Sequence, residues 1–106
     1  MSQLKIVKMN YYDKFGKKCS EEDFVYLTIN IGQEENPAPG DFFVQLSKIE
    51  GAPVIVSQYA DNEFGGNFGR PWDFYKTEEI TEKFKEMEVY IPEIKEIAKS
   101  KGIEIC

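Results

Sequence analysis

The sequence has 106 residues, of which 42% are hydrophobic and 14% aromatic, which suits one folded domain over residues 1–106 and excludes a disordered chain. It contains no histidine, which excludes Ser–His and Cys–His nucleophile pairs. The net charge of −6 argues against direct binding of nucleic acid, because phosphate contacts need clustered Lys and Arg.

Neither a membrane segment nor a metal site is predicted. No apolar run approaches the ~18 residues that a membrane span needs. The start of the chain lacks the charged and apolar regions of a signal peptide, so we expect a cytoplasmic protein if this sequence is the whole native chain. Cys19 and Cys106 are expected to be free thiols, and two cysteines without histidine do not make a zinc site. We therefore expect no metal and no cofactor.

The charge is distributed unevenly along the chain. Residues 1–19 hold five Lys against Asp13, a net charge of +4, whereas residues 20–75 hold ten acids against Lys48 and Arg70, a net charge of −8. This acidity is explained either by solubility alone or by a negative surface that steers a basic partner toward the chain.

Four strands are predicted in the first part of the chain. The clearest alternates between an aliphatic face (Val25, Leu27, Ile29 and Ile31) and a mixed face (Phe24, Tyr26, Thr28 and Asn30). The next strand carries Phe42, Val44 and Leu46 inward, and the two are expected to form an antiparallel hairpin around a Gly- and Pro-rich loop. The predicted strands are Leu4 to Tyr12, Phe24 to Ile31, Asp41 to Lys48 and Pro53 to Tyr59.

The C-terminal third has helical periodicity. One helical face is traced by Ile80, Phe84, Met87, Ile91, Ile94 and Ala98. Thr77 is the predicted N-cap, Gly102 the predicted C-cap, and Pro92 should kink or divide the helix near Tyr90. Residues 103–105 are expected to form a short final strand or tail. The fold class is therefore α+β: an antiparallel sheet of about four to five strands covered by a C-terminal helix that is kinked or split near Pro92.

No catalytic apparatus is predicted. The Gly65-to-Gly69 segment lacks the Lys-Ser/Thr of a P-loop and the spacing of a dinucleotide fingerprint, so we interpret it as part of a loop from Ala60 to Pro71. Three groups of acids, Glu34/Glu35, Asp61/Glu63 and Glu21/Glu22/Asp23, lie in polar segments where ordinary pKa values make poor general acids. Asp61-Asn62-Glu63 is a weak candidate for calcium because it lacks EF-hand spacing.

The most informative feature is a cluster of aromatic residues. Tyr59, Phe64, Phe68, Trp72, Phe74 and Tyr75 lie close together in the sequence, among Asp61, Glu63, Arg70 and Asp73. Interface hot spots favour Trp, Tyr and Arg inside a polar rim. The alternative for Trp72 and Phe74 is that they pack onto the sheet where the helix begins. Glu34 and Glu35 form either a solvated loop tip or a pair of carboxylates that faces basic groups of a partner.

The segment from Phe24 to Leu46 resembles the start of the immunity protein 8 family, small bacterial proteins encoded beside polymorphic toxins. The shared pattern is an alternating strand that ends in Ile31-Gly32, an acidic loop, and Asp41-Phe42 opening a second strand. The resemblance covers about a fifth of the chain. That family ends with a helix and a Trp-rich acidic segment, whereas here Trp72 precedes the helix. The resemblance implies a protein that neutralises a toxin by occluding it.

The leading hypothesis is an immunity protein that binds a basic toxin, such as a nuclease, and blocks its active site. We do not expect an enzyme or a membrane partner. The alternative is a non-enzymatic adaptor or regulatory binding protein, including one encoded by a phage. The predicted partner-binding residues are Glu34, Glu35, Asp61, Glu63, Phe64, Phe68, Arg70, Trp72 and Asp73.

Overall fold

The computed structural model describes residues 5–33, 38–62 and 65–105, with side chains outside 61–68. It contains six strands, two α-helices and one 3₁₀ helix over these residues. The elements are β1 (Lys5–Tyr12), β2 (Tyr26–Gly32), β3 (Phe42–Ser47), β4 (Val54–Asn62), β5 (Gly65–Phe68), β6 (Trp72–Phe74), α1 (Thr77–Lys83), η1 (Lys85–Val89) and α2 (Ile91–Ser100).

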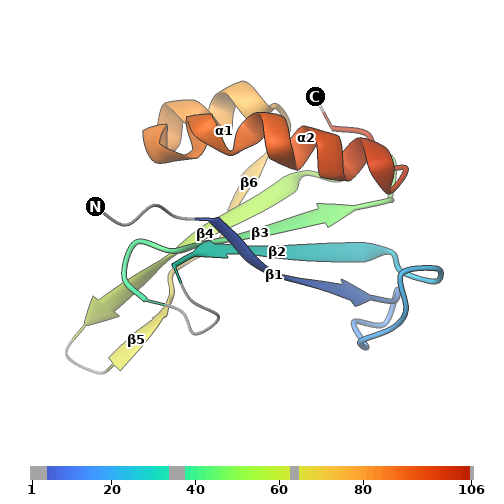
Figure 1. Ribbon diagram of the computed structural model, residues 1–106, viewed down its shortest axis with the longest axis horizontal. Helices are drawn as coiled ribbons and strands as arrows, with labels where there is room; N and C mark the ends of the chain where they lie inside the picture. Colours follow the sequence, from blue (N-terminus) through green and yellow to red (C-terminus); the bar gives the residue numbers. More distant parts are fainter. Residues whose placement is uncertain (1–4, 34–37, 63–64, 106) are drawn as a thin grey trace.

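The fold is a single antiparallel sheet with one helical layer, which confirms the predicted α+β class. The strand order is β1-β2-β3-β4, and β5 and β6 both pair with β4. The two helices and η1 all cover the same face of the sheet, and the other face has no helix on it (Figure 1). Within the described part of the chain, no helix is long and apolar enough to cross a membrane.

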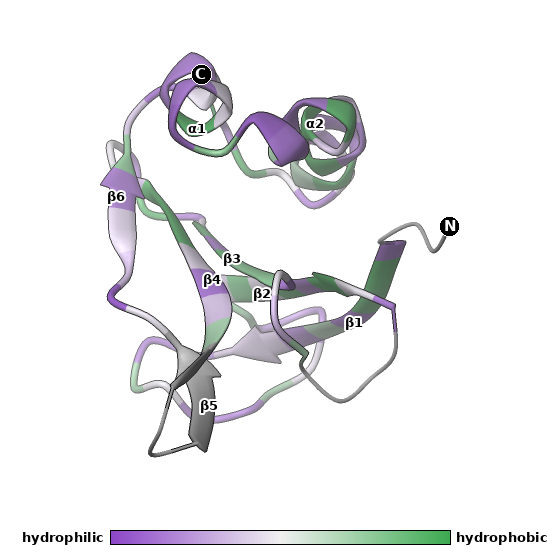
Figure 2. Cartoon of the chain, turned by 90° about the vertical axis from the view of Figure 1, so that its left-hand side faces the viewer, coloured by the Kyte–Doolittle hydropathy of each residue, from purple (hydrophilic) through white to green (hydrophobic). Residues whose placement is uncertain are grey.

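The core lies between the sheet and the helices, where β2 and β3 contribute the residues that the alternation predicted. Leu27, Ile29 and Ile31 are fully buried, and so are Val44 and Leu46. Register pairs such as Ile29 with Val44 place these side chains on the same face of the sheet. Figure 2 shows the hydrophobic strand segments lying beneath the helical layer.

Phe24 was predicted on the outer face of β2, and that prediction is wrong. β2 begins only at Tyr26, so the strand alternation does not apply to Phe24, whose side chain enters the core with 3% of its surface exposed. Its ring packs edge-on against Tyr11, with 5.0 Å between ring centroids, and the ammonium of Lys48 lies 3.9 Å from its centroid. The ring therefore seals one end of the core.

The predicted loop from Ala60 to Pro71 is also wrong, because most of it is strand. β4 continues to Asn62 and is joined by β5, with Tyr59 opposite Phe68 and Asn62 opposite Gly65. β6 continues the same arm, but its register is shifted by one residue, with Val56 opposite Trp72. The loop was predicted from the glycine content of this segment. A hairpin is held by backbone hydrogen bonds, which glycine makes as well as any other residue, so glycine content did not exclude a strand.

The helical layer begins one residue away from the predicted cap. Lys76 is the N-cap and Thr77 is the first helical residue, with a buried side chain. The Glu79 carboxylate accepts hydrogen bonds from the backbone N–H groups of Tyr75 (2.9 Å) and Lys76 (3.3 Å). These bonds satisfy the backbone donors just before the helix, whereas a Thr77 cap would have served N–H groups of the first turn.

The division of the helix near Tyr90 and Pro92 is confirmed, and the structure adds a second break. α1 ends at Lys83, and Phe84 has the non-helical dihedrals φ −127° and ψ 89°. α2 begins at Ile91, with Pro92 in its first turn, where a missing N–H costs no hydrogen bond. The apolar face survives both breaks, because Ile80, Met87 and Ala98 are all buried.

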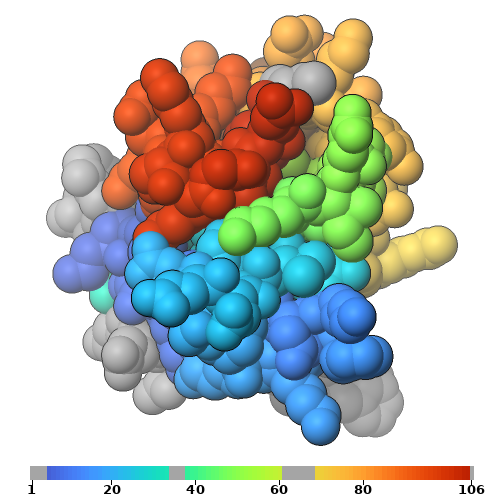
Figure 3. Space-filling view, turned by 90° about the vertical axis from the view of Figure 1, so that its right-hand side faces the viewer, coloured from blue at the N-terminus to red at the C-terminus, as the bar shows by residue number. Residues whose placement is uncertain are grey.

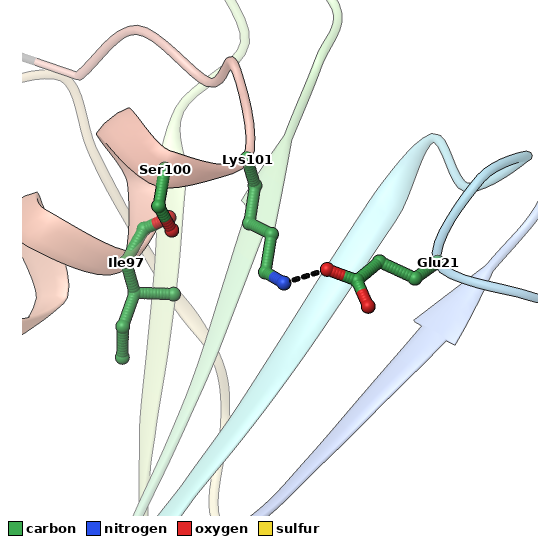
Figure 4. Close-up of polar contacts among 4 residues, drawn as sticks. All are labelled: Glu21, Ile97, Ser100 and Lys101. Atoms are coloured by element: carbon green, nitrogen blue, oxygen red, sulfur yellow. Dashed lines mark hydrogen bonds and ion pairs between the residues drawn. The ribbon is translucent and has the colours of Figure 1, made fainter.

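Gly102 ends α2 as predicted. It has φ +75°, and the N–H groups of Gly102 and Ile103 donate to the carbonyls of Lys99 and Ala98, which is a Schellman motif. Residues 103–105 form a tail without strand pairing, with Ile103 buried. Lys101 reaches from this end of α2 to an ion pair with Glu21, beside the hydrogen bond from Ser100 Oγ to the Ile97 carbonyl (Figure 4).

Candidate functional site

Three predicted partner-binding residues lie together on the outer arm of the β4–β5–β6 hairpin. Arg70, Trp72 and Asp73 are exposed, and Trp72 keeps 46% of its surface accessible. Alternation along β6 places Trp72 on the helix side of the sheet and Asp73 on the opposite side. We call Arg70, Trp72 and Asp73 the hairpin surface.

The structure separates the two aromatic residues of β6. Phe74 is 7% exposed and packs edge-on against Phe84, with 6.3 Å between centroids, so it belongs to the core. Trp72 lies at the border of the core, and the Lys83 ammonium sits 4.1 Å from its ring centroid. This cation–π contact holds the indole in place while about half of its surface faces outward.

The remaining predicted residues of this region extend toward the hairpin tip. Asp61 and Phe68 lie in β4 and β5, where Asp61 pairs with Gly66, and their side chains lie outside the described part of the structure, as do Glu63 and Phe64 entirely. Asp61 lies five residues along β4 from Val56, the position opposite Trp72, which corresponds to about 16 Å. The predicted residues therefore follow one long arm of the sheet.

The residues that follow the predicted acidic loop contact β4. Glu34 and Glu35 lie outside the described residues, and the described part of the chain resumes at Ala38. The Gly40 N–H donates to the Tyr59 carbonyl (3.0 Å), and the Tyr59 N–H donates to the Asp41 carbonyl (2.8 Å). Gly40 and Asp41, which follow this loop, are thus hydrogen-bonded to β4 at Tyr59.

The described residues hold no group of three or more Asp, Glu, Cys or His side chains that would suit a metal ion. The weak calcium candidate, Asp61-Asn62-Glu63, falls partly outside that region. Glu21, Glu22 and Asp23 are exposed. Cys19 is a free, half-buried thiol whose pKa is raised, first by burial and then by the nearby Asp13 and Asp23 carboxylates.

A large open cleft lies at the other end of the sheet. Its volume is about 1120 Å³, and it is formed by the β3–β4 turn, the end of α2 and residues 103–105. Figure 3 shows this turn (green) beside the C-terminal end of the chain (red). The lining mixes apolar groups such as Val54 and Phe74 with Lys95, Lys99, Glu50 and Glu104, and both glutamates are exposed. It is not a carboxylate-lined pocket.

A second pocket, which the sequence analysis missed, lies on the face of the sheet without helices. Its volume is about 340 Å³, and its lining residues are Tyr12, Gly16, Tyr26, Thr28, Phe43 and Gln45. The signal was present in the sequence, because Tyr26 and Thr28 were correctly assigned to the mixed face of β2. It was overlooked because only the register of β1 and β3 brings Tyr12, Phe43 and Gln45 to the same place.

Comparisons with known proteins found no counterpart: no protein-family model, no curated protein and no solved structure matches this chain.

Proposed function

We propose that this chain is a binding protein that recognises another protein through the hairpin surface. Trp72 supports this proposal most directly, because it is a large aromatic side chain that contacts the Lys83 ammonium and still keeps 46% of its surface exposed. Arg70 and Asp73 supply exposed charged groups near it in the chain, Asp73 on the opposite face of the sheet. Trp and Arg are the residue types that dominate interface energetics when they are pre-organised and surrounded by polar groups.

The edge of the sheet adds a second means of recognition. β5 and β6 pair with β4 on one side, and the sheet order places no described strand beyond them. An extended segment of a partner can add to such an edge through backbone hydrogen bonds, with Trp72 contacting its side chains.

We further propose that the partner is a basic toxin that the chain neutralises by covering its active site. Residues 20–75 carry a net charge of −8, and both loops of the binding surface belong to this segment. A basic partner would be drawn to it electrostatically, so association should be fast at low salt and slower as salt screens the charges. The proposed setting is the cytoplasm.

The test pairs Trp72→Ala with Val89→Ala. Val89 is a matched control because it is also apolar and 74% exposed, but lies in η1. The partner probe is the product of the reading frame immediately upstream, produced together with the chain. Trp72→Ala should weaken the complex about 30-fold, corresponding to a hot spot of ~2 kcal/mol, while Val89→Ala leaves it unchanged. Equal effects of the two variants would reject the hairpin surface.

Growth separates an immunity protein from an adaptor. Cells that express the upstream product should stop growing, the wild-type chain should restore growth, and Trp72→Ala should restore it poorly. A complex that forms without suppressing the partner's activity would reject the toxin proposal and leave a binding protein.

A further inference from the structure

The face of the sheet without helices carries an ordered array of aromatic and polar side chains. The registers of β1, β2 and β3 align them in rows across the strands. One row contains Tyr12, Tyr26 and Ser47; the next contains Asn10, Thr28 and Gln45; the third contains Lys8, Asn30 and Phe43. Aromatic rings thus lie beside amide groups, a combination that suits a planar ligand with a polar edge.

The 340 Å³ pocket lies within these rows. Tyr12, Tyr26 and Phe43 supply aromatic lining, and Gln45 supplies an amide. The turn after β1 forms a further side through Gly16, whose φ of +80° allows the chain to reverse there. In Figure 1, this turn and the β4–β5 hairpin both project away from the helices, at opposite ends of the sheet. The volume is near the lower end of the range of about 300–1,000 Å³ for ligand pockets.

Thr28 provides independent evidence of a site. Its side chain lines the pocket with only 4% of the residue exposed, and its hydroxyl oxygen has no hydrogen-bond partner among the described residues. A buried hydroxyl without a partner is costly, and native proteins seldom retain one without a reason. A polar atom that enters the pocket would offer it a partner.

The turn that contributes Gly16 to the pocket is basic, in contrast to the chain as a whole. Lys14, Lys17 and Lys18 are exposed on the turn that contains Gly16. The Asp13 carboxylate in the same turn is directed back to the chain, where it accepts the N–H groups of Phe15 (2.8 Å) and Lys17 (2.9 Å). This turn therefore carries three exposed ammonium groups, of which that of Lys14 contacts the Phe15 ring, and it favours an anionic group near the Gly16 end of the pocket.

We propose that this pocket binds a nucleoside phosphate. The base stacks against the aromatic rings of Tyr12, Tyr26 and Phe43, and its polar edge faces Gln45 and Thr28. The phosphate lies toward Lys14, Lys17 and Lys18. The pocket has room for one base, so the ligand is a free nucleotide rather than a long strand. This inference is independent of the hairpin surface, and either proposal can fail without the other.

The experiment is an NMR titration of the ¹⁵N-labelled full chain with adenosine 5′-monophosphate, uridine 5′-monophosphate, adenosine, inorganic phosphate and a hexanucleotide. The monophosphates should shift amide signals of residues 12–18, 26–28 and 43–45, and adenosine or phosphate alone should bind more weakly. The proposal is wrong if neither monophosphate shifts these signals at millimolar concentration. It is also wrong if only the hexanucleotide binds, with shifts spread across the whole face.

Three changes to the pocket test the assigned roles. Tyr26→Leu keeps an apolar side chain but removes a stacking ring, and should weaken binding about tenfold, since stacking contributes about 1–3 kcal/mol per base. Lys14→Gln with Lys17→Gln should weaken binding and reduce its salt dependence. Thr28→Val should weaken binding. The ¹H–¹⁵N correlation spectrum of the free variant should keep the pattern of the folded protein.

The matched control is Lys85→Gln with Lys95→Gln, which removes the same charge from exposed positions in the helical layer. It should leave nucleotide affinity unchanged. If the control weakens binding as much as the Lys14 and Lys17 pair, the attraction is non-specific and the site is rejected.

Discussion

The two faces of the sheet bury different kinds of side chain. The face beneath the helices buries only aliphatic and aromatic side chains from β2 and β3, including Leu27, Ile29 and Val44. The open face buries polar groups instead: Thr28, Asp41 and Ser57 are each 4–5% exposed although no helix covers them. The covered face stabilises the fold by removing apolar surface from water. On the open face, burial of polar groups costs part of that stability.

This difference shows which face is available for function. A uniform aliphatic face needs only complementary shape and is already occupied by the helices. A face with buried hydroxyl, carboxylate and aromatic groups has positioned chemistry that packing alone does not require. Function on this molecule is therefore expected on the open face and on the hairpin edge beside it.

The largest expected effect is on the covered face. Ile29→Ala removes a fully buried side chain and should lower the free energy of unfolding by about 3–4 kcal/mol, through lost transfer energy and the cavity left behind. Urea unfolding followed by circular dichroism measures it. The control, Ile55→Ala, changes a half-buried residue of the open face and should cost less than half as much. Equal costs would show that the two faces are not different in packing.

A second prediction concerns the open face where β2 ends and β3 begins. Gly32 lies beside Asp41, and a Cβ at Gly32 would be only 2.6 Å from the Asp41 carboxyl carbon. Gly32→Ala should therefore cost about 2 kcal/mol, because Asp41 must move and lose its hydrogen bond from the Ala38 N–H. In an Asp41→Ala background, the same change should cost much less. Unfolding of the four proteins forms a double-mutant cycle, and a cost independent of Asp41 would refute the contact.

The smallest expected effect has the opposite sign. Thr28→Val replaces a buried hydroxyl without a described partner by a methyl group of similar shape, and should raise the free energy of unfolding by up to about 1 kcal/mol. The control is Thr81→Val, because the Thr81 hydroxyl donates to the Glu78 carbonyl at 2.9 Å. Thermal and urea unfolding should show stabilisation only for Thr28→Val. Destabilisation of both variants would mean that the Thr28 hydroxyl already contributes a hydrogen bond.

Much of the fold could be predicted because its signals are local. The period of two in β2 and β3 and the helical spacing from Ile80 to Ala98 identified nearly all the buried residues in those elements. The end of α2 at Gly102 could also be predicted from a local signal, because it depends on the backbone φ of one residue. The prediction failed at Phe24 and at the β4–β5 hairpin, where the outcome depends on which distant segment lies alongside.

The candidate sites show the same division. Arg70, Trp72 and Asp73 were chosen from composition and are all exposed, and the structure settles for Trp72 a choice between core and surface that the sequence left open. The contact of Trp72 with Lys83 at the end of α1 could not be predicted from the sequence. Spacing placed Tyr26 and Thr28 on one face of β2 but could not predict the pocket to which they belong. Its residues come from three strands and a turn, and they meet only through the sheet register.

By itself, the sequence determined where the first four strands and the helical region form and which of their faces are buried, because these properties follow from periodicity within a few residues. Tertiary structure alone decided that Phe24 closes the core, that a glycine-rich segment becomes an edge hairpin, and that Thr28 lies buried between aromatic rings. The physical reason is that burial and hydrogen bonding at these positions depend on partners far away in the chain, which a local pattern does not encode.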